Sequence, residues 1–585
     1  MYVDVDEADV TILNQNLNKS IELFENISKS LHIMSNKSKT ASNTIKPVLK
    51  DVNELIESKK GVESLINTLK EVSEAAGKVT SFEHILNDNI ESIGLIKYMN
   101  SLNSAKQLYK SIQSKSGNFK GVVGNFNNLI NNSETKVQNY LQSLVNSDPN
   151  TLINKKPDIK YIFEYFTKDN NDEQIKKQYI TARSQFMIKK LSILTGDCLK
   201  TTAPFEKGQH SINKYTDLFL DSTSQEFAVI KQCQIPNILP IIIENVLINY
   251  IGSIISKYQF SEDSYLLILE ITDNLIKLQY ILKNKYSLSN NRFNLAIEEF
   301  INDHRNIFIT FVHQTDSKFN IGKLNEQISQ QLITDILNKL RKFSEFKIPL
   351  IQLISKFHPG QWLIQQNPPV KFVNVYSSVI PKNDEIKPDY LLSSFYSDMI
   401  DCIMINIEIG LKNTELKKTI QGFILIKDMF MVETIINRSQ DLFQSLGSIG
   451  QERMTKLKNR FLKIFLDDFS HSSYIIIRDM TSIATSQASS TSGNATNLTS
   501  KEKENVKELF QNFNKSFEEA LSNYQKLSFG DQILKNYLIN EIKKMIVPSY
   551  NKLYDKYGNS DFTKNKSKYV KWDKYQFEQL LNSSL

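Results

Sequence analysis

The stretch VTILNQNLNKSIELFENISKSLHIM, from Val10 to Met34, opens a seven-residue pattern that continues to Leu55. Of the fourteen a and d positions between residues 10 and 55, twelve are apolar, and the exceptions are Ser20 and Ser38. Apolar side chains that recur alternately every three and four residues lie along one stripe of an α-helix. Because one register holds over so many heptads, the pattern favours a coiled coil, or a long helix that needs a partner, over an ordinary amphipathic bundle helix.

This apolar stripe is the first candidate binding surface of the chain. Pro47 lies inside the pattern, and we expect it to bend or break the helix, because proline lacks a backbone N–H group and its ring clashes with the preceding turn. The predicted partner contacts, which we call the seam, are Leu13, Leu17, Phe24, Ile27, Leu31 and Met34.

The composition of the whole chain also predicts helices. The chain has 585 residues, of which 40% are hydrophobic and 23% are charged, and this balance is typical of a folded protein. It contains only 18 glycines and 13 prolines, so few turns are expected and long helices are favoured over sandwiches or barrels. No convincing alternation of apolar and polar residues predicts a strand. We therefore predict an all-α fold.

Two stretches interrupt the helical pattern. Residues 357–390 hold five of the thirteen prolines and predict a long irregular connection between bundles. Residues 484–500 include nine serines and threonines, which cannot form a core, and predict a mobile loop. The predicted domains are 1–70, a coiled-coil helix for assembly; 71–235, 236–375 and 376–500, three helical bundles; and 501–585, a C-terminal bundle.

The cysteines and the N-terminus indicate a cytoplasmic protein. Cys198, Cys233 and Cys402 are odd in number and far apart, so a disulfide framework is not expected and a reducing compartment is. The acidic N-terminus has no apolar signal-peptide core. The most apolar run, residues 235–255, is interrupted by two prolines and Glu244, so we interpret it as a buried helix and not as a membrane span.

The sequence carries no motif that would support catalysis. It has no phosphate-binding loop of the GxxxxGK[ST] type, no GxGxxG, no GxSxG and no HExxH. No two histidines have the i,i+4 spacing of a helical metal site, so neither a metal nor a cofactor is expected. In a helical chain, this pattern favours binding over enzymatic activity. The scattered histidines are His32, His84, His210, His304, His313, His358 and His471.

Two C-terminal helices follow the Ser/Thr-rich stretch. Ser500 resembles a helix start, because Glu502 and Glu504 would lie in the first turn, where the helix dipole favours negative charge. A second helix is expected from about Gln532, and we predict that it stops near Pro548.

The last candidate site is the basic and aromatic end of the chain, KYVKWDKYQFEQLL, from Lys568 to Leu581. Between Glu541 and Lys574, nine lysines stand against four acids, a net charge of +5 out of +7 for the chain. If this end is helical, Lys564, Lys568 and Lys571 share one face, since they are four and three residues apart. The candidate lysines are Lys564, Lys566, Lys568, Lys571 and Lys574.

Three interpretations of this end remain open from the residues alone. The lysines could form a solvated face that only keeps the protein soluble. They could instead hold an anionic membrane surface, where each lysine contributes roughly 1 kcal/mol and several act together. Trp572 could then lie at the headgroup boundary or anchor the segment to its own bundle. A nucleic-acid site is the weakest interpretation, because no recognisable binding module or stacking platform accompanies the lysines.

The C-terminal residues resemble a known family. The segments KEKENVKELFQNFNKSFEEALSNYQKL, EIKKMIVPSYNKLYDKYG and KYVKWDKYQFEQLL resemble the end of the seventy-kilodalton subunit of the exocyst complex, the exocyst component seven family. Upstream, QYITARSQFMIKKLSIL and KDMFMVETIINRSQDLFQSLG are similar to its Tyr-x-x-x-Arg-Ser helix and to a mid-chain helix pair. The N-terminal heptads are similar to its first helix.

The resemblance implies a fold, a role and partners. It implies an elongated rod of stacked antiparallel helical bundles, preceded by a coiled-coil-like helix that pairs with other exocyst subunits. The role would be to tether secretory vesicles at the inner face of the plasma membrane in exocytosis, with a Rho-type GTPase as regulator. In the family the paired lysines bind phosphatidylinositol 4,5-bisphosphate, and these correspond to Lys568 and Lys571; Trp572 stands where a tyrosine is usual. Lys564, Lys566 and Lys574 are added from local charge, and the alternative is a structural scaffold without lipid binding.

Overall fold

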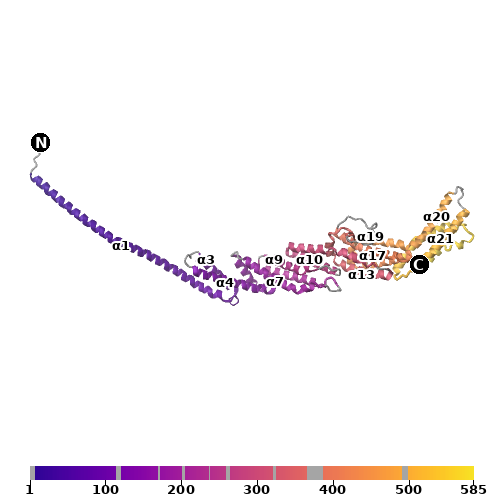
Figure 1. Ribbon diagram of the computed structural model, residues 1–585, viewed down its shortest axis with the longest axis horizontal. Helices are drawn as coiled ribbons and strands as arrows, with labels where there is room; N and C mark the ends of the chain where they lie inside the picture. The colour runs from indigo at the N-terminus through magenta and orange to yellow at the C-terminus, as the bar shows by residue number, and fades with distance from the viewer. Residues whose placement is uncertain are drawn as a thin grey trace, which may run out of the picture. The chain divides into compact units, whose positions relative to one another are not determined.

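The computed structural model describes residues 7–113, 120–168, 172–200, 205–235, 237–258, 264–320, 324–364, 387–489 and 498–585. Within these ranges every regular element is a helix, so the predicted all-α class is confirmed (Figure 1). The chain divides into two compact units, residues Met1–Tyr179 and Ile180–Leu585.

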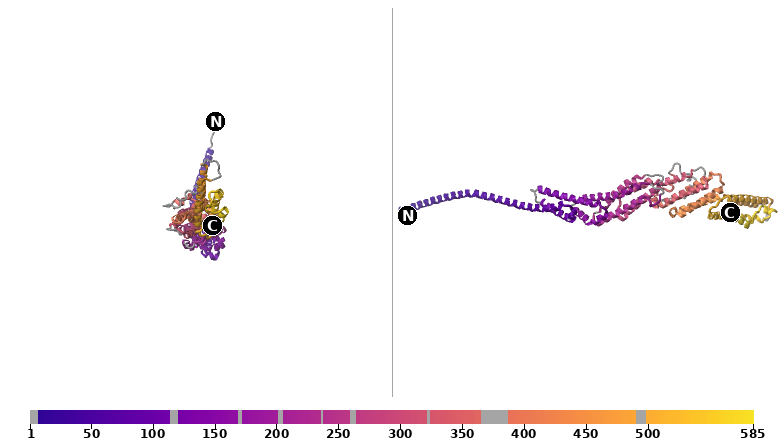
Figure 2. Two further views of the ribbon diagram at one scale, coloured as in Figure 1. Left: turned by 90° about the vertical axis from the view of Figure 1, so that its right-hand side faces the viewer. Right: turned by 90° about the horizontal axis from the view of Figure 1, so that it is seen from below.

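The first unit begins with one very long helix, α1, Glu7–Asn87, of 81 residues. Figures 1 and 2 show it as a continuous, curved ribbon, and it runs through Pro47 without interruption, so of the expected bend or break at Pro47 the break is not found. The physical reason is that proline at an exposed position removes only one backbone hydrogen bond, the one to the carbonyl of Asn43. The regular turns on both sides keep the helix together.

No other described part of the chain packs against most of α1. The six seam side chains are between 51% and 74% exposed, and Phe24 is the most exposed of them. Large apolar side chains left in water over many turns are unfavourable unless a partner covers them. The heptads therefore form a helix, as predicted, whose seam is open in the isolated chain.

Only the end of α1 packs within its own unit. It contacts α3 and α4, and Leu86 is fully buried there. Lys136 of α4 donates hydrogen bonds to the last carbonyls of α1, at 3.0 Å from Leu86 O and 2.8 Å from Asn87 O. A cation at a helix C-terminus satisfies carbonyls that have no partner in the helix. The other helices of this unit are α2 Ile90–Ile93, α3 Leu95–Gln113, α4 Lys120–Val145, α5 Pro149–Asn154 and α6 Lys156–Lys168, and α7 Asp172–Cys198 begins in it.

The second unit starts with helices around the apolar run predicted as a buried helix. That run forms α9, Leu239–Ser253, which packs against α8 and α11. Among the described residues, Leu239–Lys257 is the one stretch long and apolar enough to cross a membrane by length and composition. Its buried face, which includes Ile242 and Val246, contacts other helices of the unit, as expected for a core helix. The neighbouring helices are α8 Ser211–Gln232, η1 Ile255–Lys257, α10 Tyr265–Tyr286, α11 Asn291–His304, α12 Ile307–Ser317, α13 Glu326–Ser344, α14 Lys347–Ile354 and α15 Gln361–Ile364.

Helix α17 forms the centre of the core of this unit. It packs against α12, α13, α14, α18 and α19, and every residue from Leu391 to Glu408 is buried. A helix buried on all sides must pair its polar side chains, because an unpaired buried charge is costly. Asp398 and Asp401 both accept hydrogen bonds from Arg453 of α19. The helices concerned are α17 Pro388–Lys412, α18 Lys418–Arg438 and α19 Gln440–Phe465.

The last helices form the C-terminal bundle, in which α20 packs against α21 and α22, and α22 against α23. Helix α20 continues to Ser489, so residues 484–489 are helical and not part of the predicted loop; residues 490–497 of that loop lie outside the described ranges. Most of the predicted connection at 357–390 also lies outside them. The helices are α20 Asp467–Ser489, α21 Ser500–Tyr524, α22 Gln532–Leu553, η2 Tyr554–Gly558, η3 Lys566–Lys568 and α23 Lys574–Ser584.

The start of α21 is as predicted, and the end of α22 is not. Thr499 caps α21 through a capping box with Glu502, and the helix begins at Ser500. Helix α22 does not stop at Pro548 but runs to Leu553. Tyr550 and Leu553 are fully buried. Packing of these side chains outweighs the single hydrogen bond that the proline removes.

Candidate functional site: the C-terminal basic segment

The segment that carries the predicted lipid-binding lysines is not a long helix. After η2 the chain is irregular except for the short 3₁₀ turn Lys566–Lys568, and the last helix begins only at Lys574. The prediction that Lys564, Lys568 and Lys571 share one helical face is therefore wrong. The lysines lie instead along a strap, residues 559–573, that crosses the C-terminal bundle, with Lys574 directly after it.

Two hydrogen bonds to the backbone fix the course of the strap. Asn514 of α21 donates from its side-chain amide to the carbonyl of Tyr569, at 2.7 Å. The hydroxyl of Tyr550 on α22 donates to the carbonyl of Trp572, at 2.6 Å. These carbonyls would otherwise have no helical partner, and buried carbonyls are expensive to leave unpaired. This long-range pairing explains why the strap does not become helical.

The aromatic residues of the strap are anchors within the bundle. The indole ring of Trp572 is half-buried and packs edge-on against Phe517, with ring centroids 5.7 Å apart, and lies 6.0 Å from Phe577. Phe577 in turn stacks on Tyr550 at 4.0 Å. Such offset and edge-to-face pairs add to the burial of apolar area. The structure therefore places Trp572 against its own bundle, which was one of the two positions left open by the sequence.

The lysine side chains of the strap lie outside this aromatic core. Lys564 and Lys568 are exposed, and within the described residues neither forms an ion pair. Lys571 is exposed and pairs with Glu518 of α21. Lys566 lies 3.8 Å from Asp561, and Lys574 lies 2.5 Å from Asp555.

These ion pairs do not disable the lysines as ligands for an anion. Both partners in each pair are largely exposed, and exposed ion pairs contribute only about 0–1 kcal/mol. A polyanion that contacts several lysines at once can therefore replace the carboxylates. Nothing in the sequence pattern pointed to Glu518, which is 53 residues from Lys571 and meets it only through the fold.

The structure gathers the residues of one predicted site on a single bundle and leaves those of the other site uncovered. The five lysines of the C-terminal site are brought together on, or directly beside, one irregular strap of a single bundle. The seam residues Leu13 to Met34 lie on α1, and no described part of the chain contacts them closely enough to bury them.

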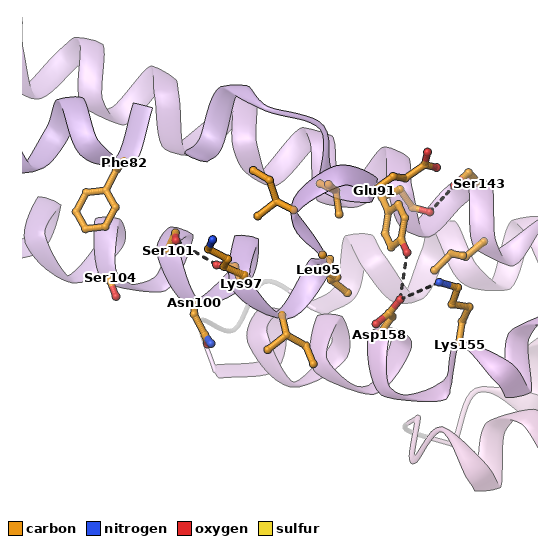
Figure 3. Close-up of a pocket in the computed structure, with 16 residues that line it drawn as sticks. Phe82, Glu91, Leu95, Lys97, Asn100, Ser101, Ser104, Ser143, Lys155 and Asp158 are labelled. Atoms are coloured by element: carbon orange, nitrogen blue, oxygen red, sulfur yellow. Dashed lines mark hydrogen bonds and ion pairs between the residues drawn. The ribbon is translucent and has the colours of Figure 1, made fainter. Parts of the chain in front are cut away.

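One cavity among the described residues lies in the first unit and has the character of an open groove between helices. Its volume is about 990 Å³, and it is lined by parts of α1, α2, α3, α4 and α6 (Figure 3). The hydroxyl of Tyr140 lies 3.1 Å from Asp158, whose carboxylate is 3.9 Å from Lys155. Burial, with the nearby carboxylate of Asp158, raises the pKa of Tyr140 to about 12. These groups satisfy one another, and the raised pKa keeps the Tyr140 hydroxyl protonated, so the pair does not supply an activated nucleophile.

Metal and thiol chemistry find no support among the described residues. No group of three or more histidine, cysteine, aspartate or glutamate side chains there is placed to hold a metal ion. The three cysteines are buried, and burial raises the pKa of Cys198 to about 12, so its thiol stays protonated.

Comparison with known proteins identifies the family. The family model for the C-terminal part of the Exo70 exocyst complex subunit matches residues 219–583, and the model for the N-terminal part of exocyst complex component Exo70 matches residues 47–147. This chain belongs to the Exo70 family of exocyst complex subunits. It is similar to Exo70 of Candida albicans, with 48% identity over 100% of this chain and 99% of the relative. Exo70 of Saccharomyces cerevisiae is 25% identical, with 99% of each chain covered.

Solved structures show the same fold. The chain resembles a structure of S. cerevisiae Exo70 refined to 2.1 Å, with a TM-score of 0.68, 23% identity, and coverage of 88% of this chain and 98% of that one. A crystal structure of the same yeast protein gives a TM-score of 0.67. The Exo70 match covers both the helical bundles and the C-terminal strap, so the resemblance seen in the sequence is confirmed.

Within the Exo70 fold, the other family-like helices have structural roles. In the Tyr-x-x-x-Arg-Ser helix, Arg183 is fully buried, its Nε–H is shared between the two carboxylate oxygens of Glu226 at 3.0 and 3.1 Å, and its Nη2 also donates to Glu226. The mid-chain helix pair forms α18 and α19, which pack closely together. These residues define the core and are not available for a ligand.

Proposed function

We propose that this chain is the exocyst subunit that docks secretory vesicles at the plasma membrane by binding phosphatidylinositol 4,5-bisphosphate through its C-terminal strap. The observation that carries the proposal is the position of Lys568 and Lys571. Both side chains are exposed, while the carbonyl of the residue directly after each lysine accepts a hydrogen bond from the bundle, that of Tyr569 from Asn514 and that of Trp572 from Tyr550. Lysines presented on a fixed backbone lose little conformational freedom of the main chain when they bind.

The seam of α1 provides the second contact in this proposal. Its exposed apolar side chains would be covered by helices of other exocyst subunits, which joins the chain to the complex. A chain that binds the complex through one segment and the lipid through another works as a bivalent link. The family further suggests a Rho-type GTPase as partner and a location at the inner face of the plasma membrane, and we propose both without assigning residues to the GTPase.

The experiment that tests the proposal is co-sedimentation of the full chain with vesicles that do or do not contain phosphatidylinositol 4,5-bisphosphate. The variant is Lys568→Ala with Lys571→Ala. A matched control is Lys501→Ala with Lys526→Ala, which removes the same charge from exposed lysines of the same bundle that have no ion pair in the described structure. We expect the strap variant alone to lose most lipid-dependent binding. Equal binding by both variants would favour a structural scaffold whose lysines only keep it soluble.

A further inference from the structure

The charge of α1 is distributed unevenly along the helix. From Asn26 to Lys50 there is no acidic residue, whereas Glu22 and Glu25 precede this stretch and Asp51 follows it. The stretch holds five lysines, so its net charge of +5 equals that of the C-terminal segment. Its lysines are Lys29, Lys37, Lys39, Lys46 and Lys50.

Four of these lysines lie on one face of the helix. Lys39, Lys46 and Lys50 are separated by seven and four residues, which are close to whole numbers of helical turns, and Lys29 lies ten residues before Lys39, about 80° around the helix from it. In the heptad register of the seam they occupy positions f, b, b and f, on the side opposite the a and d positions. All four are exposed. We call these four lysines the basic stripe, and at 1.5 Å per residue it extends over roughly 32 Å.

Within the described residues, the stripe lysines have few acidic side chains near enough to pair with them. Lys50 lies 3.8 Å from Glu54, and both side chains are more than 60% exposed, so this i,i+4 pair is weak. The b, c and f positions between the lysines hold the short polar residues Asn36, Thr40 and Asn43, and also His32, Ile33 and Pro47. None of these side chains is as long as lysine, so the lysine amino groups extend beyond them.

We propose that the basic stripe rests on an anionic lipid surface while the opposite, apolar seam faces partner helices. A flat row of separate positive charges suits a surface with many diffuse negative charges better than a single small ligand. The stretch from Asn26 to Lys50 contains no phenylalanine, tyrosine or tryptophan, so it offers no platform of such rings for stacked nucleic-acid bases. The stripe lies on α1, in the first unit, and this contact therefore goes beyond the C-terminal one and does not depend on it.

The opposed faces make the proposal testable. If α1 instead lay on the membrane with its apolar seam in the lipid, the stripe would point into water, and removing its lysines would have little effect. The proposal requires the reverse: that the stripe lysines contribute directly, and that the contact weakens as salt rises.

The experiment compares full-length variants on vesicles of phosphatidylcholine with or without phosphatidylserine. The stripe variant carries glutamine at Lys29, Lys39, Lys46 and Lys50, since glutamine keeps helix propensity. The matched control carries glutamine at four exposed lysines of α1 outside the stripe, Lys19, Lys59, Lys60 and Lys70. Each is made with the natural strap and with the Lys568→Ala, Lys571→Ala strap, and circular dichroism checks for equal helicity.

The stripe variant should bind phosphatidylserine vesicles about tenfold or more weakly than the matched control at low salt, and by the same factor in both strap backgrounds. Equal binding by the stripe variant and the matched control would overturn the proposal. The proposal would also be overturned if the stripe variant lost binding to an acidic protein but still bound the vesicles as strongly as the matched control. If the C-terminal lysines are not the lipid contact, a different result will show it: the strap variant will still bind phosphatidylinositol 4,5-bisphosphate.

Discussion

The hydroxyl of Tyr550 donates a 2.6 Å hydrogen bond to the backbone carbonyl of Trp572, 22 residues later in the chain. The bond joins the last long helix to the strap that carries the exposed lysines. Burial raises the pKa of Tyr550 far above its ordinary value, so the hydroxyl remains a donor at physiological pH. Lysine presentation in this bundle therefore depends on a buried side chain that no lipid would touch.

Removing this hydroxyl should weaken both stability and lipid binding. Tyr550→Phe leaves the Trp572 carbonyl without its donor, and we expect a loss of about 1–2 kcal/mol in the free energy of unfolding, measured by urea denaturation. Affinity for phosphatidylinositol 4,5-bisphosphate vesicles should fall although no charge has changed. Tyr575→Phe is the control, because Tyr575 is 70% exposed and its hydroxyl has no comparable role. Unchanged vesicle binding in Tyr550→Phe would show that the strap does not need this anchor.

Releasing Lys571 from its partner should have the opposite effect on lipid binding. Glu518→Gln removes the carboxylate that pairs with Lys571 and one negative charge beside the strap. Because the pair is exposed, stability should change by no more than about 0.5 kcal/mol, whereas affinity for anionic vesicles should rise. Glu508→Gln, an exposed acid of the same helix without an ion pair in the described structure, provides the control. A rise of equal size in both variants would mean that only net charge matters.

Breaking the buried Arg183–Glu226 pair should be much more costly. Both side chains are almost completely buried, and removing one partner leaves an uncompensated charge in the core. We expect Arg183→Ala to lower the free energy of unfolding by about 3–5 kcal/mol. Lys277→Ala, which breaks the exposed 2.9 Å pair with Asp217, should cost less than about 1 kcal/mol. Similar costs in the two variants would contradict this account of the core.

Asp428 should make stability depend on pH. Its side chain is fully buried, and burial raises its pKa from 3.8 to about 7 although Ser329 lies beside it. The native state therefore holds this proton more tightly than the unfolded state. Its contribution to stability is full below the ordinary pKa and is lost as pH rises toward about 7, by up to about 1.4 kcal/mol per pH unit.

Urea denaturation at a series of pH values measures this dependence. Asp428→Asn, which cannot ionise, should flatten the profile in that window and unfold less readily than the natural chain at neutral pH. Asp51→Asn, at an exposed position on α1, should leave the profile as it is. An unchanged slope in Asp428→Asn would mean that another group controls it.

The helices that sequence predicts best are those set by local periodicity. The heptads of α1 and the start of α21 at Ser500 depend on residues within one or two turns, and both are found in the structure. The predicted stop at Pro548 is wrong and no break occurs at Pro47, because the rule for a proline inside a helix is local. At Pro548, burial of Tyr550 and Leu553 outweighs it.

The shape of the candidate site could not be predicted in the same way. The strap takes its course from Asn514 and Tyr550, whose partners Tyr569 and Trp572 are 55 and 22 residues away in the chain. Spacing alone suggested a helical face for the lysines, and only tertiary hydrogen bonds decide against it. The identity of the candidate lysines came from the family resemblance and local charge, which do not depend on their backbone conformation.

The most direct test of the central claim is the reactivity of individual lysines on the membrane. The full chain is treated briefly with an amine-acetylating reagent, with and without phosphatidylinositol 4,5-bisphosphate vesicles, and each lysine is quantified by mass spectrometry. The account predicts that Lys568 and Lys571 become protected only when the lipid is present, while Lys501 and Lys526 of the same bundle react as before. Equal reactivity of Lys568 and Lys571 in both conditions, with the protein bound to the vesicles, would contradict the claim that the strap contacts the lipid.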